Sequence, residues 1–302
     1  MENYDEQNAR KALELWIKER SEAEHAKANV SKLLEDSSSM QTMECGIPCA
    51  WRLVTPTSEP EEIVFKMQGI IICSELPPFN KHIGRKTNAS VLRQGVTLTG
   101  LGLPEFDSAV SGIKIGDLML KRNVPLQGLE TLSCFGEFCG VPSVSISNRY
   151  FTSRRLAKGE KPVEIGSEID PAQILRRSSS EFVHIRENVV GYERAQGIDK
   201  KELKFQPVSP AIFRVGDIVE VQFTLMTIRP ARSLYKTVPV LRTITLLDDY
   251  FSKQVDVKAI CDASSHRKPS TFAVKRRAGN WDETEETTAK QLRRMEISDG
   301  RH

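Results

Sequence analysis

The chain has 302 residues, of which 39% are hydrophobic and 27% are charged, with a formal net charge of +3. This composition lies near that of globular proteins and excludes a wholly disordered chain. So small a net charge is compatible with binding to a polyanion but does not by itself predict it.

The compartment is inferred from apolar runs and cysteines. No apolar run approaches the roughly 18 residues that a membrane span needs, and the acidic start lacks the apolar stretch of a signal peptide. Six cysteines are scattered along the chain, and scattered cysteines in an unsecreted chain are expected to be reduced thiols. We therefore expect an intracellular protein, cytoplasmic or nuclear, without a membrane partner.

Residues 1–40 predict a long, charged N-terminal helix. Apolar or long side chains recur at spacings of four and three from Ala9 to Leu34, and neither Gly nor Pro interrupts them. Arg20 and Lys27 lie on this seam, which weakens a coiled-coil interpretation. Such a helix needs a surface to pack on. That surface is either its own domain or, through residues 9–34, a protein partner or a second copy of the chain.

Residues 41–148 are expected to form a β-rich region, because short apolar runs alternate with Gly and Pro. Val96–Thr99 and Val144–Ser147 show the period-two alternation of strands with one solvent-facing side. The run Ile113–Leu120 is also interpreted as a strand.

Residues 149–204 are more charged and predict a connector with local helix. Residues 205–260 predict a second β region, whose two long apolar segments form a hairpin with a basic tip. Residues 261–302 are polar and predict a disordered tail.

The two β regions share a short pattern. Ile113-Lys-Ile-Gly-Asp resembles Phe213-Arg-Val-Gly-Asp, and each Gly-Asp suits a tight turn that enters a strand. The pattern indicates either a duplicated β module or chance convergence. The expected fold class is therefore α+β and predominantly β. The long N-terminal helix is followed by one or two small antiparallel β modules, OB-like or SH3-like barrels or sandwiches, and then by the disordered tail.

Motifs of standard catalytic sites are absent from the sequence. There is neither a phosphate-binding glycine loop nor a nucleophile elbow or zinc-protease helix. We therefore expect a non-enzymatic binding module. The alternatives are an enzyme whose site is assembled in space from His82, His184, Cys134 or Asp117, and a structural oligomer built through the N-terminal helix.

Two close cysteine pairs suggest zinc. Cys45 and Cys49 form one pair and Cys134 and Cys139 the other, and each pair encloses a Gly that would help the loop to wrap around an ion. The alternative is buried free cysteine, which behaves as a small hydrophobic residue. No other cofactor is predicted.

Basic residues with nearby aromatic rings suggest nucleic acid as a partner, because arginine and lysine bind phosphates and rings stack on bases. The candidates are Arg229, Arg232, Tyr235, Lys236, Arg154 and Arg155. The alternative is a solvated surface of mixed charge. Ser179, which follows Arg176-Arg177, is a candidate phosphorylation site.

The segment Ser209-Pro-Ala-Ile-Phe-Arg-Val-Gly-Asp-Ile-Val-Glu-Val-Gln, followed by Val240-Leu-Arg-Thr-Ile-Thr-Leu-Leu-Asp-Asp, carries a resemblance. Residues 205–250 resemble an uncharacterised protein family that is abundant in mushroom-forming fungi. The resemblance implies a eukaryotic, intracellular setting and assigns neither an activity nor site residues.

Overall fold

A computed structural model describes nine segments of the chain, all of them within residues 1–258. They are residues 4–22, 29–33, 35, 39–79, 89–124, 130–177, 181–197, 203–229 and 234–255. The predicted disordered tail, 261–302, lies outside them. No helix in the described residues is both long and apolar enough to cross a membrane.

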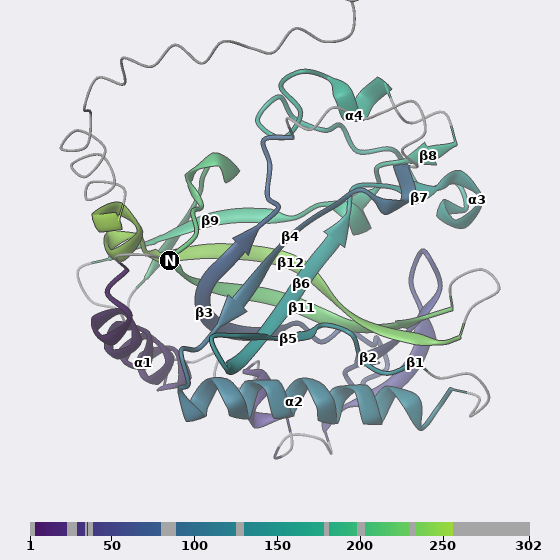
Figure 1. Ribbon diagram of the computed structural model, residues 1–302. Coiled ribbons are helices and arrows are strands. Elements are labelled where there is room, and N and C mark those ends of the chain that lie inside the picture. Colours follow the sequence, from purple (N-terminus) through teal and green to yellow (C-terminus); the bar gives the residue numbers. More distant parts are fainter. Residues whose placement is uncertain are drawn as a thin grey trace, which may run out of the picture. The chain divides into compact units, whose positions relative to one another are not determined.

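Five strands close into a barrel (Figure 1). Three of them, β3 (Phe65–Ser74), β4 (Arg93–Thr99) and β6 (Val141–Arg149), form an antiparallel meander. The long hairpin of β11 (Ile218–Ile228) and β12 (Lys236–Asp248) completes the ring. In it β12 lies parallel to β6, and β11 lies antiparallel to β3. A five-stranded, partly open barrel with this order has the connectivity of the OB fold.

Further strands extend the barrel sheet. On one side β11 pairs with β2 (Ala50–Val54), which pairs with β1 (Gln41–Cys45). On the other side β12 pairs with β9 (Gly191–Gln196), which pairs with β10 (Lys204–Pro207). The short β5 (Phe135–Phe138) pairs with β6.

Of the two options that the sequence left open, one or two β modules, the structure shows one. The strands of residues 41–148 and 205–260 share a single sheet, and the connector contributes β9 and the first residue of β10 to it. The interpretation of residues 205–260 as a separate second β region is corrected accordingly. Nearly every side chain of β11 is buried, and a two-stranded hairpin cannot bury both of its faces alone.

The predicted strand Ile113–Leu120 is wrong, because these residues belong to the helix α2 (Pro104–Lys121). Its buried residues Phe106, Val110 and Ile113 follow the helical period. The helix packs on β2, β3, β6 and β11 and runs below the strands in Figure 1.

The two Gly-Asp sequences therefore have different structures. Gly116 lies inside α2, where a Cβ atom would come within 2.3 Å of Leu225 on β11, so glycine permits the close approach of helix and sheet. Gly216 lies in a turn that enters β11 and has a positive φ of 95°, as expected for a turn glycine. The duplicated-module interpretation is not supported by these two conformations.

The N-terminal helix α1 (Glu6–Glu22) packs on its own domain. Ala9, Leu13 and Trp16 are buried and belong to the main core. The helix is shorter than predicted: it ends at Glu22, and residues 29–33 form a bridge to β3 and the short 3-10 helix η2 (Val30–Lys32). The Asn29 side chain accepts a hydrogen bond from the Ser31 amide, a local bond that competes with helix formation. Self-association through residues 9–34 stays a prediction.

A small subdomain lies beyond the ends of β4 and β6. It contains the strands β7 (Thr152–Ser153) and β8 (Phe182–Val183) and the short helices α3 (Arg154–Ala157) and α4 (Ile174–Arg177). Its own apolar cluster is built from Phe79, Ala89, Tyr150, Phe151, Ile165 and Leu175. Three further 3-10 turns are η4 (Ala89–Val91), η5 (Arg186–Asn188) and η6 (Pro210–Ile212).

Candidate nucleic-acid interface

The outer face of β4 and β6 carries polar side chains in matched pairs. In the antiparallel register Arg93 lies opposite Arg149, Gly95 opposite Ser147, and Thr97 opposite Ser145. Alternate residues of a strand point to the same face. Their neighbours Val96 and Leu98, and Val144 and Ile146, fill the barrel core. The period-two prediction for these strands is confirmed.

A groove runs over this face. One cleft of about 140 Å³ is lined by residues of β3, β4 and β6, and a smaller one of about 20 Å³ is lined by β6, β11 and β12. Both include Arg93 and Ser147 in their linings, and these two adjoining clefts are together called the β4–β6 groove. Its lining reaches the loop end of the β11–β12 hairpin, at Ile228 and Val238.

Glycine keeps the floor of the groove low. A Cβ atom on Gly95 would lie 2.5 Å from the Ser147 Cβ atom and 2.6 Å from the Ile146 carbonyl oxygen. Beside it the Thr97 and Ser145 hydroxyl groups are 2.9 Å apart and hydrogen-bonded. The floor is therefore a flat surface with small hydroxyl groups.

Arg93 and Arg149 bring two positive charges to the groove, whose lining also includes the acids Glu75 and Glu187. Burial, followed by the neighbouring Arg93 charge, lowers the pKa of Arg149 below its usual value. Within the described segments, no carboxylate forms an ion pair with Arg93 or Arg149. Two guanidinium groups side by side repel each other, and an anion that binds between them relieves this repulsion.

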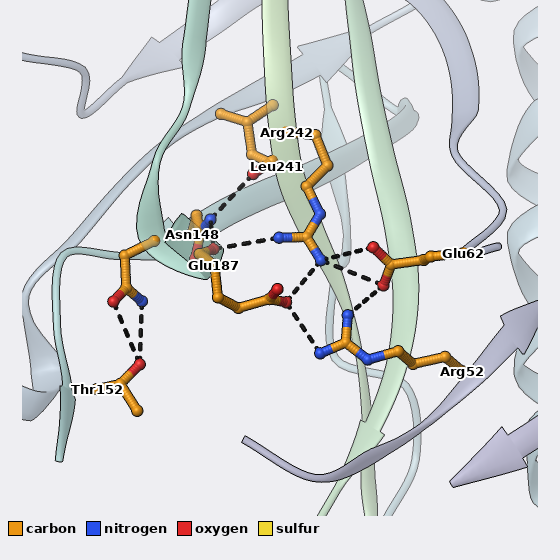
Figure 2. Close-up of polar contacts among 8 residues, drawn as sticks. Arg52, Glu62, Asn148, Thr152, Glu187, Leu241 and Arg242 are labelled. Carbon is orange, nitrogen blue, oxygen red and sulfur yellow. Dashed lines mark hydrogen bonds and ion pairs between the residues drawn. The ribbon is translucent and has the colours of Figure 1, made fainter. Parts of the chain in front are cut away.

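Glu187, the acid that acts electrostatically on Arg149, is held by other arginines (Figure 2). Its carboxylate accepts hydrogen bonds from Arg52 at 2.9 Å and from Arg242 at 2.6 Å. The same two arginines bind Glu62, with an Arg242 Nη2 to Glu62 Oε2 distance of 2.9 Å. Two cations thus meet two anions, and Glu187 attracts Arg149 only at longer range.

Backbone contacts fix this ion network beside the groove. The Asn148 amide donates to the carbonyl oxygens of Glu187 and Leu241, at 2.9 and 3.2 Å (Figure 2). These bonds tie η5 and β12 to the end of β6, where the barrel strands β6 and β12 share a single bridge. These bonds leave one buried atom of the network, Arg52 Nε, without a partner, and they hold the backbone next to Arg149 in place.

Part of the predicted basic site lies at the hairpin end. The Arg229 guanidinium carbon is 5.3 Å from the centre of the Tyr235 ring, in cation–π geometry. Lys236 begins β12 opposite Ile228, which lines the β4–β6 groove. Arg232 lies outside the described residues.

The other predicted basic residues lie elsewhere. Arg154 and Arg155 belong to α3 in the small subdomain, and neither lines the groove. The structure thus divides the predicted set between two places. The candidate phosphorylation site, Ser179, lies outside the described segments.

The described residues of the alternative enzyme site lie in two places. Asp117 pairs with Lys121 at 2.7 Å and lies near Cys134, whose thiol pKa is raised to about 12 by burial. His184 lies instead in the small subdomain, hydrogen-bonded to the Tyr150 carbonyl oxygen. His82 lies outside the described residues.

The predicted zinc site is not assembled. Cys45 and Cys49 flank the β1–β2 turn, and Cys134 and Cys139 lie on either side of β5. In the part of the chain that the structure describes, no three His, Cys, Asp or Glu side chains form a group that could hold a metal ion.

The sequence analysis missed Arg93 and Arg149. Each stands at the end of a strand with recognisable alternation, which is the available signal. Their pairing depends on the register between β4 and β6, and that register is set by contacts between strands more than 40 residues apart.

Comparisons with known proteins do not name a family. No family model and no curated protein matches the chain. The resemblance of residues 205–250 to a family of mushroom-forming fungi therefore stays a prediction.

The solved structures found include gp2.5, a single-stranded DNA binding protein encoded by bacteriophage T7. It has a TM-score of 0.33 and 11% identity, over 61% of this chain and 86% of that one. Another is the single-stranded DNA-binding protein from bacteriophage Enc34 in complex with ssDNA, with a TM-score of 0.31 and 10% identity, over 70% and 96%. At such values the likeness carries no argument about this chain.

Proposed function

We propose that the protein binds single-stranded nucleic acid along the β4–β6 groove and catalyses no reaction. The observation that carries this proposal is the cross-strand Arg93–Arg149 pair on the outer face of an OB-type barrel, where neither arginine forms an ion pair with a described carboxylate. In that fold the face of the second and third strands, together with the loop between the fourth and fifth, binds oligonucleotides. Here those elements are β4, β6 and the β11–β12 loop.

Each part of the groove has a role in this proposal. Phosphates bind between the two guanidinium groups, and the hydroxyl groups of Thr97, Ser145 and Ser147 donate to phosphate or sugar oxygens. Aromatic rings are missing from the described lining. Base stacking is therefore expected at Tyr235 on the hairpin, and little base preference is expected over the floor.

The shape of the groove favours one strand over a duplex. It is a depression two to three β-strands wide, which is about 10–15 Å. A duplex is read by an element that protrudes into its major groove, and a depression cannot supply that contact.

The experiment is a salt-dependent binding assay with a fluorescent single-stranded oligonucleotide and the corresponding duplex. Arg93→Gln is compared with Lys18→Gln, which removes the same charge from the exposed side of α1. We expect Arg93→Gln to weaken single-strand binding about tenfold at 50 mM salt and to lower the salt slope by about one, because one phosphate contact is lost.

Lys18→Gln should leave both quantities near the wild-type values. Two results would overturn the proposal. One is no detectable binding by the wild-type protein at 50 mM salt, and the other is equal binding by the two variants.

A further inference from the structure

A second cleft lies in the small subdomain. It has a volume of about 210 Å³, lies among α3, α4 and β8, and shares no lining residue with the β4–β6 groove. Its lining combines apolar side chains with nitrogen-bearing ones: Phe151, Val163, Phe182, Arg154, Arg176 and His184.

His184 presents a bare ring nitrogen to this cleft. The side chain is 7% exposed, and its Nδ1 atom lies 2.7 Å from the Tyr150 carbonyl oxygen. A carbonyl oxygen only accepts, so Nδ1 carries the hydrogen and Nε2 has a free lone pair. Nε2 is hydrogen-bonded to no described residue and is not sealed from open space, so it faces the cleft that His184 lines. Burial lowers the pKa of His184, which keeps the ring neutral at pH 7.

Two arginines line the same cleft. Arg154 begins α3, and Arg176 lies in the last turn of α4. The Arg176 guanidinium forms an ion pair with Glu164, whose side chain is 80% exposed. A surface ion pair of this type contributes little stability, so a phosphate can replace the Glu164 carboxylate at small cost.

We propose that this cleft binds one nucleotide. Its base lies between the apolar side chains and donates an N–H to His184 Nε2, and its phosphate lies against Arg154 and Arg176. A cavity of about 150 Å³ is enough to admit benzene, so 210 Å³ admits a base ring. The inference extends the proposed function, because the nucleotide would belong to the bound strand.

The first test is a calorimetric titration of the full chain with adenosine 5′-monophosphate, ribose 5-phosphate and inorganic phosphate. We expect a signal for the nucleotide at least tenfold tighter than for ribose 5-phosphate, since only the nucleotide has a ring. Equal affinities for all three probes would mean that the cleft binds phosphate alone, and the proposal would fail.

The second test fills the cleft. Val163 is 37% exposed and lines the cleft, whereas Val189 is 41% exposed and lies outside it. Val163→Trp should abolish nucleotide binding and weaken single-strand binding about tenfold, or about 1.4 kcal/mol. Val189→Trp is the matched control and should leave both unchanged. Equal behaviour of the two variants contradicts the proposal.

Arg93→Gln separates this inference from the proposed function. It should weaken single-strand binding while leaving the binding of the mononucleotide unchanged. If the strand binds and the mononucleotide does not, the cleft proposal fails and the groove proposal stands. If the mononucleotide binds and no strand does, the proposed function fails, and the cleft is a mononucleotide site.

Discussion

Arg20 and Arg149 are both largely buried on the outside of the barrel, but their surroundings differ in charge. Arg20, from α1, forms two hydrogen bonds of 2.7 and 2.8 Å with Glu220 on β11. This bond raises the pKa of Arg20 and lowers the pKa of Glu220. Arg149 faces Arg93, and its pKa is lowered. One cation is therefore neutralised and the other is not.

One face of the barrel is covered by a helix and the other is open. Over β3 and β11 the helix α1 covers the strands, and its Arg20 is the counter-ion of Glu220. Over β4 and β6, Glu75 and Glu187 line the groove, but neither forms an ion pair with Arg93 or Arg149, and Glu187 is bound to Arg52 and Arg242. A desolvated charge without a partner costs free energy in the free protein, and a ligand of opposite charge recovers this cost.

The largest expected change in stability comes from breaking the Arg20–Glu220 ion pair. Arg20→Met leaves Glu220, whose side chain is 1% exposed, without its cation. We expect the free energy of unfolding to fall by about 3 kcal/mol at pH 7, measured by urea unfolding with Trp16 on the same helix as a fluorescent reporter. The double variant Arg20→Met/Glu220→Leu should recover most of the loss, because neither charge of the pair remains. A single variant as stable as the wild type would show that the pair is not buried in solution.

The second effect concerns Asp217, the buried acid at the start of β11. It accepts hydrogen bonds from the Ser252 hydroxyl and the Arg214 amide, and burial raises its pKa to about 6. The folded state therefore binds this proton more tightly than the unfolded state, whose pKa is about 3.9. The contribution of the protonated Asp217 to the free energy of unfolding is fully present below about pH 4. It is lost as the pH rises through about 6, and the loss is about 2–3 kcal/mol.

Asp217→Asn is the test. The variant side chain has one acceptor oxygen and an NH2 group, so it accepts only one of these two hydrogen bonds at every pH, which lowers stability by a constant amount and removes the titration. The difference in unfolding free energy between wild type and variant should therefore shrink between pH 4 and pH 7. A difference that does not change with pH would show that Asp217 has an ordinary pKa.

A smaller effect of opposite sign is expected on the open face. Arg149→Met removes a desolvated cation that faces another cation, so the free energy of unfolding should rise by about 0.5–1 kcal/mol. The same variant should bind single strands more weakly. Arg242→Met, in the compensated network, is the matched control and should be destabilised. A loss of stability in both variants would mean that Arg149 has a partner in solution.

The smallest effect is expected at the hairpin. Arg229→Gln removes the cation that stacks on Tyr235 and should weaken single-strand binding about threefold, equivalent to about 0.5–1 kcal/mol at an exposed site. Lys18→Gln again controls for the change in net charge, in the same binding assay with a fluorescent oligonucleotide. If the two variants bind equally, the hairpin takes no part and the site is confined to the groove.

Local patterns predicted much of the fold. The period-two alternation of β4 and β6 and the apolar runs of β11 and β12 depend on neighbouring residues alone, so they were visible in the sequence. The strand predicted at Ile113–Leu120 failed because a short apolar run fits a buried strand and a buried helix equally well. Pro104 in the first turn and the spacing of Phe106 and Val110 were the signals that favour the helix.

The candidate site was predicted less well. The hairpin residues Arg229 and Tyr235 stood out as a basic cluster near an aromatic ring, and the structure places them together. Arg93 and Arg149 are isolated in the sequence and become neighbours only through the register of two strands. The cysteine pairs show the converse, since closeness along the chain did not bring the four thiols together in space.

By itself the sequence determined the β-rich class, the helix at the N-terminus and the basic hairpin end, because propensity, periodicity and composition act over a few residues. Tertiary structure alone decided that the two β regions close into one barrel, that α1 neutralises Glu220, and that Arg93 and Arg149 share an open groove. Those outcomes depend on the burial of both sheet faces and on strand register. Both arise from contacts between residues far apart in the chain, and a local pattern does not encode them.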